Sequence, residues 1–121
     1  MKNILHLIRG REGESLAARH LQQHGLKILA RNVRIGGGEL DLVCQEGATI
    51  IFAEVRLRQS GGLVGAAESI TPAKQRKWRS AASAYLQKHY PALPDCRFDA
   101  ICIERGSDGK AQIEWLRGVE I

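Results

Sequence analysis

Near residue 25 the hydrophobic pattern changes from helical spacing to the alternation of strands. Within residues 12–24, the apolar residues Leu16, Ala17 and Leu21 recur at the spacing of one helix face. Gly25 follows at a place where a left-handed residue ends many helices. The pattern therefore predicts a first helix over residues 12–24.

Three runs rich in β-branched and apolar residues follow this helix. They cover residues 26–35, 39–45 and 49–58. Three consecutive glycines, 36–38, predict a turn or bulge before the second run, and Glu46 and Gly47 predict a tight turn after it. We expect the second and third runs to form an antiparallel hairpin.

The second half of the chain begins with a glycine-containing loop, predicted over residues 60–70. Thr71 suits an N-cap and Pro72 a first helical position, so a long helix is predicted over residues 72–90. Its inward face should carry Trp78, Ala81, Ala82, Tyr85 and Leu86. Two further strands are predicted, over residues 96–104 and 111–118.

These elements follow the order α-β-β-β-α-β-β, which predicts an α/β fold with a central mixed β-sheet flanked by helices. The helix between the third and fourth strands permits a parallel crossover, which should be right-handed. No repeat, low-complexity tract or linker interrupts residues 1–121, so we expect a single domain.

Acidic residues interrupt the apolar hairpin. Side chains two apart on a strand share a face, so Glu39 and Asp41 point to one side, as do Glu54 and Arg56. Crowded carboxylates repel one another, and a divalent cation is the simplest partner that makes the crowding favourable. Carboxylate oxygens suit Mg²⁺ or Mn²⁺, and Arg56 adds a fixed positive charge.

The hairpin register decides which of these groups meet. The predicted turn places Glu39 opposite Glu54 and Asp41 opposite Phe52, so that all three carboxylates crowd one face. Glu39 is interpreted as a supporting acid rather than as a direct ligand.

The alternative is a solvent-exposed face on which Arg56 and Glu54 form a surface salt bridge. Two features favour a buried site. The run IIFAEV is too apolar for a strand fully in water, and Arg58 adds a second base on the same side.

The chain has 18 Lys and Arg against 13 Asp and Glu, a formal net charge of +5. Such an excess suits nucleic-acid binding, because Lys and Arg displace the counterions condensed on phosphates. Lys74, Arg76 and Arg79 on the second helix are candidate phosphate contacts, and a merely solvated helix face is the alternative. The few aromatic residues do not cluster, which argues against a base-stacking platform.

Other function classes find less support. Three cysteines without a CxxC pair argue against a disulfide scaffold and a zinc ribbon. His20 and His24 lie four residues apart and could share a metal, but the sequence offers no third ligand nearby. No apolar stretch approaches the roughly 20 residues of a membrane span, and the start lacks a signal-peptide core, so we expect a cytoplasmic protein without membrane partners.

Two further acids have two interpretations each. Glu14 falls in the first turn of the predicted helix, where an acid either belongs to a site or favours the helix dipole. Asp99, within RFDAI, is expected to pair with Arg97 or with a loop amide.

The hairpin motifs resemble those of a known family. GGGELDL followed by FAEVRLR is similar to the GEID…FVEVKxR signature of the YraN-like family of uncharacterised bacterial proteins. The similarity extends from REGESLAARHLQQHGLKILARNVR through SITPAKQRKWRSAASAYL to CRFDAICI. These separated blocks stand in the family's order and cover most of the chain.

The resemblance implies a restriction-endonuclease-like fold of the PD-(D/E)XK kind, similar to archaeal Holliday-junction resolvases. In that fold an acid on the first hairpin strand and an E-x-K motif on the second bind a metal and activate water. By position, Asp41 and Glu54 would be the two acids. The backbone carbonyl of Val55 would be a further metal ligand, and Glu14 would be the metal-binding acid contributed by the first helix.

This chain departs from the family pattern at Arg56, where the motif has lysine. A buried lysine can lose its proton, whereas arginine stays charged and can only position and stabilise. The leading hypothesis is therefore a Mg²⁺- or Mn²⁺-dependent nuclease-like protein acting on DNA, with branched or junction DNA as a candidate substrate and a homodimer as a candidate assembly. The alternatives are a non-cleaving nucleic-acid-binding module and a protein-interaction domain with an incidental basic surface.

Overall fold

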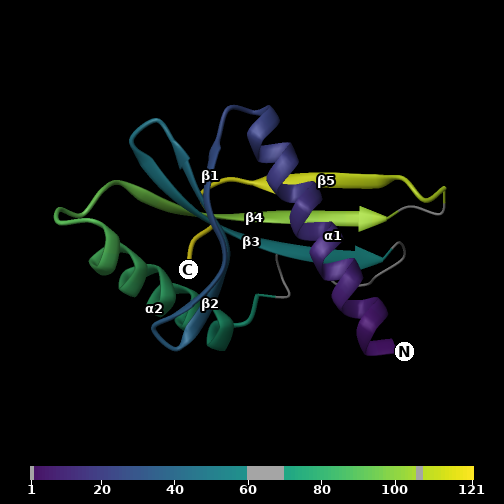
Figure 1. Cartoon of the computed structure of the whole chain (residues 1–121), viewed down its shortest axis with the longest axis horizontal. Coiled ribbons are helices and arrows are strands. Elements are labelled where there is room, and N and C mark those ends of the chain that lie inside the picture. The colour runs from purple at the N-terminus through teal and green to yellow at the C-terminus, as the bar shows by residue number, and fades with distance from the viewer. Residues whose placement is uncertain (1, 60–69, 106–107) are drawn as a thin grey trace.

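The computed structural model describes the backbone of residues 2–59, 70–105 and 108–121, and the side chains of residues 12–57, 70–104 and 108–121. Its elements, in chain order, are α1 (Lys2–Gln23), β1 (Lys27–Ile35), β2 (Gly38–Glu46), β3 (Thr49–Gln59), α2 (Pro72–His89), β4 (Cys96–Arg105) and β5 (Ala111–Leu116). The predicted order α-β-β-β-α-β-β and the α/β class are confirmed (Figure 1). The loop predicted over residues 60–70 lies outside the described residues, except for Ile70.

The five strands form one mixed sheet in the order β1-β2-β3-β4-β5. Only the central pair, β3 and β4, is parallel, and α2 provides the connection that a parallel pair requires. The other three pairs are antiparallel. Within the part of the chain that the structure describes, no helix is long and apolar enough to cross a membrane.

The first helix begins earlier than predicted, at Lys2 instead of residue 12. Gly10 and Gly13, two residues of low helix propensity, both lie within α1. At Gly13 the missing side chain has a packing role, since a Cβ there would lie 3.0 Å from Cδ1 of Leu57 on β3. Glu14 is consequently a mid-helix residue, and its interpretation as a first-turn acid is wrong.

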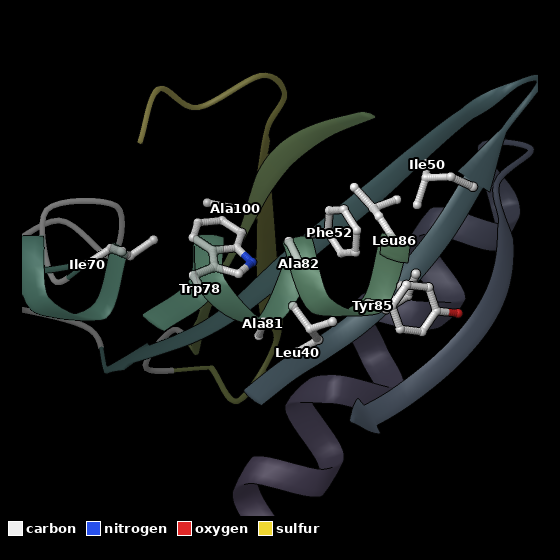
Figure 2. Close-up of a cluster of buried hydrophobic side chains, with 11 residues drawn as sticks. Leu40, Ile50, Phe52, Ile70, Trp78, Ala81, Ala82, Tyr85, Leu86 and Ala100 are labelled. Atoms are coloured by element: carbon white, nitrogen blue, oxygen red, sulfur yellow. The ribbon is translucent and has the colours of Figure 1, made fainter. Parts of the chain in front are cut away.

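Each helix covers its own face of the sheet with its own apolar cluster. Trp78, Ala81, Ala82, Tyr85 and Leu86 of α2 are buried, as predicted, and pack on sheet residues that include Leu40 and Phe52 (Figure 2). On the opposite face, Ala17, Ala18 and Leu21 of α1 pack on Leu42, Ile51 and Ala53. Because neighbouring strand residues point to opposite faces, β3 contributes alternately to the two clusters.

The β2–β3 hairpin has a different register from the predicted one. Glu46 pairs with Thr49, so Gly47 and Ala48 form the turn, and Gly47 takes a left-handed φ of 58°. Phe52 therefore lies opposite Val43 and not opposite Asp41. Since the error is two residues, the acids keep the predicted face but change partners.

Candidate metal and phosphate site

The candidate site lies where β2 and β3 separate. Their pairing runs from the turn to Leu42 opposite Ala53 and ends there. Just beyond this point the backbone N–H of Val55 donates to Oδ2 of Asp41 at 2.9 Å. The side chain of Asp41 thus takes the hydrogen bond that a strand neighbour would otherwise provide, and it lies beside Glu54 instead of Phe52.

The Glu54 carboxyl group is largely removed from water. Its side chain is 18% exposed and receives Nη2 of Arg56 at 3.2 Å, while the Arg56 side chain is 19% exposed. Burial and the neighbouring Asp41 charge raise the pKa of Glu54 to about 8, against the opposing charges of Arg56 and Lys74. The Arg56–Glu54 salt bridge of the alternative interpretation is therefore confirmed, but its two side chains are largely buried and not solvent-exposed as that interpretation expected.

The two carboxyl groups also hydrogen-bond to each other, and this contact further raises the pKa of Glu54. A hydrogen bond between carboxyl groups requires a proton on one of them. With a pKa of about 8, Glu54 holds that proton at neutral pH.

The backbone of Val55 faces the same gap. The N–H and C=O groups of one strand residue point to the same edge of the strand. Because the N–H of Val55 reaches Asp41 on β2, its carbonyl also faces the β2 side, beyond the last β2–β3 pair. The carboxyl oxygens of Asp41 and Glu54 and the carbonyl oxygen of Val55 therefore border this opening.

Two more predicted acids lie close by. Burial raises the pKa of the half-buried Glu14, a hydrogen bond with the Asn32 side chain lowers it, and the charges of Asp41 and Glu39 raise it again. Glu14 therefore lies close enough to Asp41 and Glu39 for their charges to affect its pKa. Glu39 is exposed and lies opposite Arg34 of β1, so the predicted pairing of Glu39 with Glu54 is wrong.

A cleft of about 300 Å³ opens beside Glu54. Its lining includes Glu39, Glu54 and Arg56 from the hairpin and Lys74, Lys77 and Trp78 from α2. Two buried donors in this lining, Nε of Arg56 and Nε1 of Trp78, have no hydrogen-bond partner among the described residues. Since buried N–H groups usually have a partner, this cleft is a place where a ligand would supply acceptors.

A second hollow, of about 640 Å³, adjoins the first one and shares Gly38, Glu39 and Lys77 with it. Arg34 and the glycine turn complete much of its lining. The turn packs tightly on α2, because Oγ of Ser80 donates to the Gly36 carbonyl at 2.6 Å and a Cβ on Gly38 would clash with the Lys77 carbonyl. Only glycine allows this approach of the turn to the helix.

The predicted basic residues do not act as one group. Lys74 lines the cleft, whereas the exposed Arg76 and Arg79 line neither hollow. The side chain of Arg58 lies outside the described residues. Lys77 and Arg34 belong to the site but were not predicted. Helical spacing offered a signal for Lys77, since it follows Lys74 by three residues and precedes the inward Trp78.

The described residues contain no group of three or more His, Cys, Asp or Glu side chains arranged to hold a metal. The proposed protein ligands are instead the two adjacent carboxyl groups and the Val55 carbonyl. Just after the C-terminal end of α1, Nδ1 of His24 lies 2.8 Å from the carbonyl oxygen of His20. The centroids of the two imidazole rings lie 4.4 Å apart.

The remaining buried acid, Asp99, has a structural environment. Its side chain accepts from Arg97, from Nε1 of Trp115 at 2.9 Å and from the Gly118 N–H at 2.9 Å. The expected pairing with Arg97 or a loop amide is confirmed, and both partners are present. Asp99 ties β4 to β5 and to the segment that follows it.

Comparison with known proteins places these residues in a family context. Residues 13–103 match the model of a family described as uncharacterised protein family UPF0102. A UPF0102 protein of Dichelobacter nodosus is 50% identical over 111 residues, which cover 92% of this chain and 87% of the relative. Similar proteins of Dechloromonas aromatica and Desulfitobacterium hafniense are 46% and 43% identical, over 90% and 91% of this chain and 85% and 93% of their own lengths. These matches confirm the family resemblance that the hairpin motifs predicted.

Proposed function

The chain belongs to the UPF0102 family, and from the geometry of its site we propose that it is a metal-dependent nuclease-like protein acting on DNA. Branched or junction DNA is the candidate substrate. The observation that carries this proposal is the partly buried carboxyl pair, Asp41 and Glu54, beside a cleft that Lys74 and Lys77 also line. Such a site pairs cation ligands with groups that bind phosphate.

The donor atoms fit Mg²⁺ or Mn²⁺. Carboxylate and carbonyl oxygens are the donors that these ions prefer, and Mg²⁺ is commonly bound through only one or two carboxylates together with substrate phosphates. Asp41, Glu54 and the Val55 carbonyl would hold the ion, with Glu14 near Asp41 as a supporting acid. When bound, such an ion supplies Lewis acidity, which neutralises phosphate charge and makes a water molecule more acidic.

The residues of the chain would share the remaining work. The Val55 N–H fixes Asp41, and Arg56 orients Glu54 through their ion pair. Arg56 stays protonated, so it stabilises negative charge on a phosphate but does not accept the proton of an attacking water. Lys74 reaches the same cleft from α2 and adds a second positive charge beside the carboxyl pair.

The second candidate function is a DNA-binding module that does not cleave. One specific observation favours it, namely that Arg56 stands at the motif lysine and holds Glu54 at 3.2 Å. Both candidates share the phosphate-binding cleft and differ only in chemistry. With either one we expect a cytoplasmic location, and for the nuclease a homodimer that pairs two sites on two strands.

Single-turnover cleavage of linear, flapped and four-way-junction DNA with Mn²⁺ tests the proposal. We expect weak cleavage by the wild type and no cleavage by the double variant Asp41→Asn, Glu54→Gln. Arg56→Lys should increase the rate, because it restores a group that can pass on a proton. Glu120→Gln, at an exposed acid of the C-terminal segment, is the matched control and should retain the wild-type rate.

Cleavage that survives in the double variant would contradict the assignment of the site. Robust wild-type cleavage that decreases in Arg56→Lys would show that arginine is the working residue. If neither wild type nor Arg56→Lys cleaves while both still bind DNA, the binding module is the correct function.

A further inference from the structure

The two hollows beside α2 form one continuous groove. They share Gly38, Glu39 and Lys77, and the groove leads from Arg34 on β1, past the glycine turn, to Lys74 and Glu54. We call it the α2 groove. Figure 1 shows α2 lying beside the β1–β2 end of the sheet, where this turn is located.

The charge of the α2 groove suits a polyanion. Four cationic side chains line it, Arg34, Arg56, Lys74 and Lys77, against the two acids Glu39 and Glu54. The cations also follow the length of the groove, with Arg34 at one end, Lys77 where the two hollows meet, and Lys74 and Arg56 at the other end.

Part of the groove is lined by bare backbone, namely the glycine turn 36–38 that packs against α2. Gly36 and Gly38 are pressed against the helix, while Gly37 between them has a φ of 79° and open space, with no atom within 4 Å, where a Cβ would lie. A glycine turn without side chains allows another backbone to approach closely. Ser80 fixes the turn to α2, so the groove has its shape before any ligand binds.

The groove also contains donors that lack acceptors. Trp78 is only 4% exposed, and neither its Nε1 nor Nε of Arg56 has a partner among the described residues. Phosphate oxygens are acceptors, whereas the apolar clusters on either side of the sheet offer none. Both the charge and the unpaired donors therefore favour a phosphate-bearing ligand.

From these observations we propose that the α2 groove holds the phosphodiester backbone of one strand of a DNA duplex and guides it to the Asp41–Glu54 pair. The inference rests on the proposed function and adds the path of the strand. It assigns Arg34 and Lys77 to phosphate contacts, together with Lys74. It leaves Arg76 and Arg79, which line neither hollow, outside the path.

Fluorescence anisotropy with a short labelled DNA duplex in EDTA tests this path without metal or cleavage. Arg34→Ala with Lys77→Ala should weaken binding about tenfold and reduce the salt slope by about 1.8, the value for two lost phosphate contacts. Arg76→Ala with Arg79→Ala removes the same charge from exposed positions and should change the affinity less than about twofold. Equal weakening by the two double variants would overturn the proposal.

A second pair of variants keeps the cations intact. Gly37→Asp adds a negative charge to the groove wall, and Gly37→Asn adds a side chain of the same shape and shares the strain of the positive φ. The aspartate variant should bind DNA at least about fivefold more weakly than the asparagine variant, and equal affinities would overturn the path. Tighter binding of an RNA duplex of the same sequence would overturn the assignment to DNA.

These experiments fail separately from the proposed function. Binding in EDTA is measured without metal and without cleavage, so it tests only the path of the strand, whereas cleavage by the Asp41 and Glu54 variants tests only the proposed metal ligands. If the wild type does not cleave but the Arg34 and Lys77 double variant binds DNA more weakly, only the nuclease function is contradicted. If that double variant binds DNA as tightly as the wild type, only the path of the strand is contradicted.

Discussion

Asp99 and Glu54 are both carboxyl groups placed inside the same sheet, on adjacent parallel strands. Asp99 is fully buried, and four donors point at it: Nε and Nη2 of Arg97, Nε1 of Trp115 and the Gly118 N–H. Glu54 retains 18% exposure of its side chain and has one ion-pair partner, Arg56, beside a second carboxyl group. The more deeply buried acid is thus the better satisfied one.

This difference in hydrogen bonding distinguishes an acid with a structural role, Asp99, from an acid of a candidate binding site, Glu54. A buried carboxylate with its hydrogen bonds complete has no need of a ligand. Glu54 lies next to Asp41, shares a proton with it and opens to a cleft, so a cation would replace unfavourable contacts with favourable ones. Burial alone would have selected Asp99, whereas a neighbouring carboxyl group and an open cleft select Glu54.

The largest expected effect is on Asp99. Asp99→Asn should lower the free energy of unfolding by about 3 kcal/mol, because Arg97 would lose its buried counter-charge. Urea unfolding of wild type and variant measures this loss. The control is Asp108→Asn, at an exposed acid that accepts a hydrogen bond from the Lys110 N–H, and it should cost less than about 0.5 kcal/mol. If Asp99→Asn lowers the free energy of unfolding as little as Asp108→Asn does, the structural role of Asp99 is contradicted.

A smaller effect of opposite sign is expected at Glu54. Its pKa is about 8 in the folded protein and usually near 4.5, so the folded state keeps a proton that the unfolded chain has released. Between these values stability should fall as pH rises, and the loss should be complete above about pH 8. Without divalent cations at pH 8.5, Glu54→Gln should therefore be more stable than wild type by at least about 1 kcal/mol.

Urea unfolding from pH 5 to pH 9 in EDTA gives the measurement. Near pH 5 the free energies of unfolding of the two proteins should differ little. At that pH Glu54 is protonated in the folded wild type and is also partly protonated in the unfolded chain. The same dependence on pH in both proteins would show that Glu54 is not the strained acid described here.

Much of the fold, and the two acids compared here, could be predicted from the sequence. Alternation and helical spacing located the strands and the inner face of α2, because burial of an apolar face dictates both patterns. The pairing of Asp99 with Arg97 was also predictable, since side chains two apart share a face. The acids of the hairpin stood out because carboxylates are rare among buried strand residues.

Other features depended on tertiary contacts. The register error arose at Gly47 and Ala48, because the sequence allows more than one two-residue turn in this stretch. The continuation of α1 through Gly13 depends on the close approach of Leu57, which no local propensity reports. Lys77 was missed because the basic residues are distributed around α2, and only the packing of the glycine turn shows which of them face the groove.

The most direct test of the central claim is the count of protons released when Mn²⁺ binds. Calorimetric titrations in two buffers of different ionisation enthalpy give this number. With a pKa of about 8 for Glu54, binding at pH 7 should release about 0.9 proton from the carboxyl pair, and at pH 9 only about 0.1. The double variant Asp41→Asn, Glu54→Gln should show no binding heat. Binding of Mn²⁺ without release of a proton at pH 7, or equal binding by the double variant, would contradict a cation site built on Asp41 and Glu54.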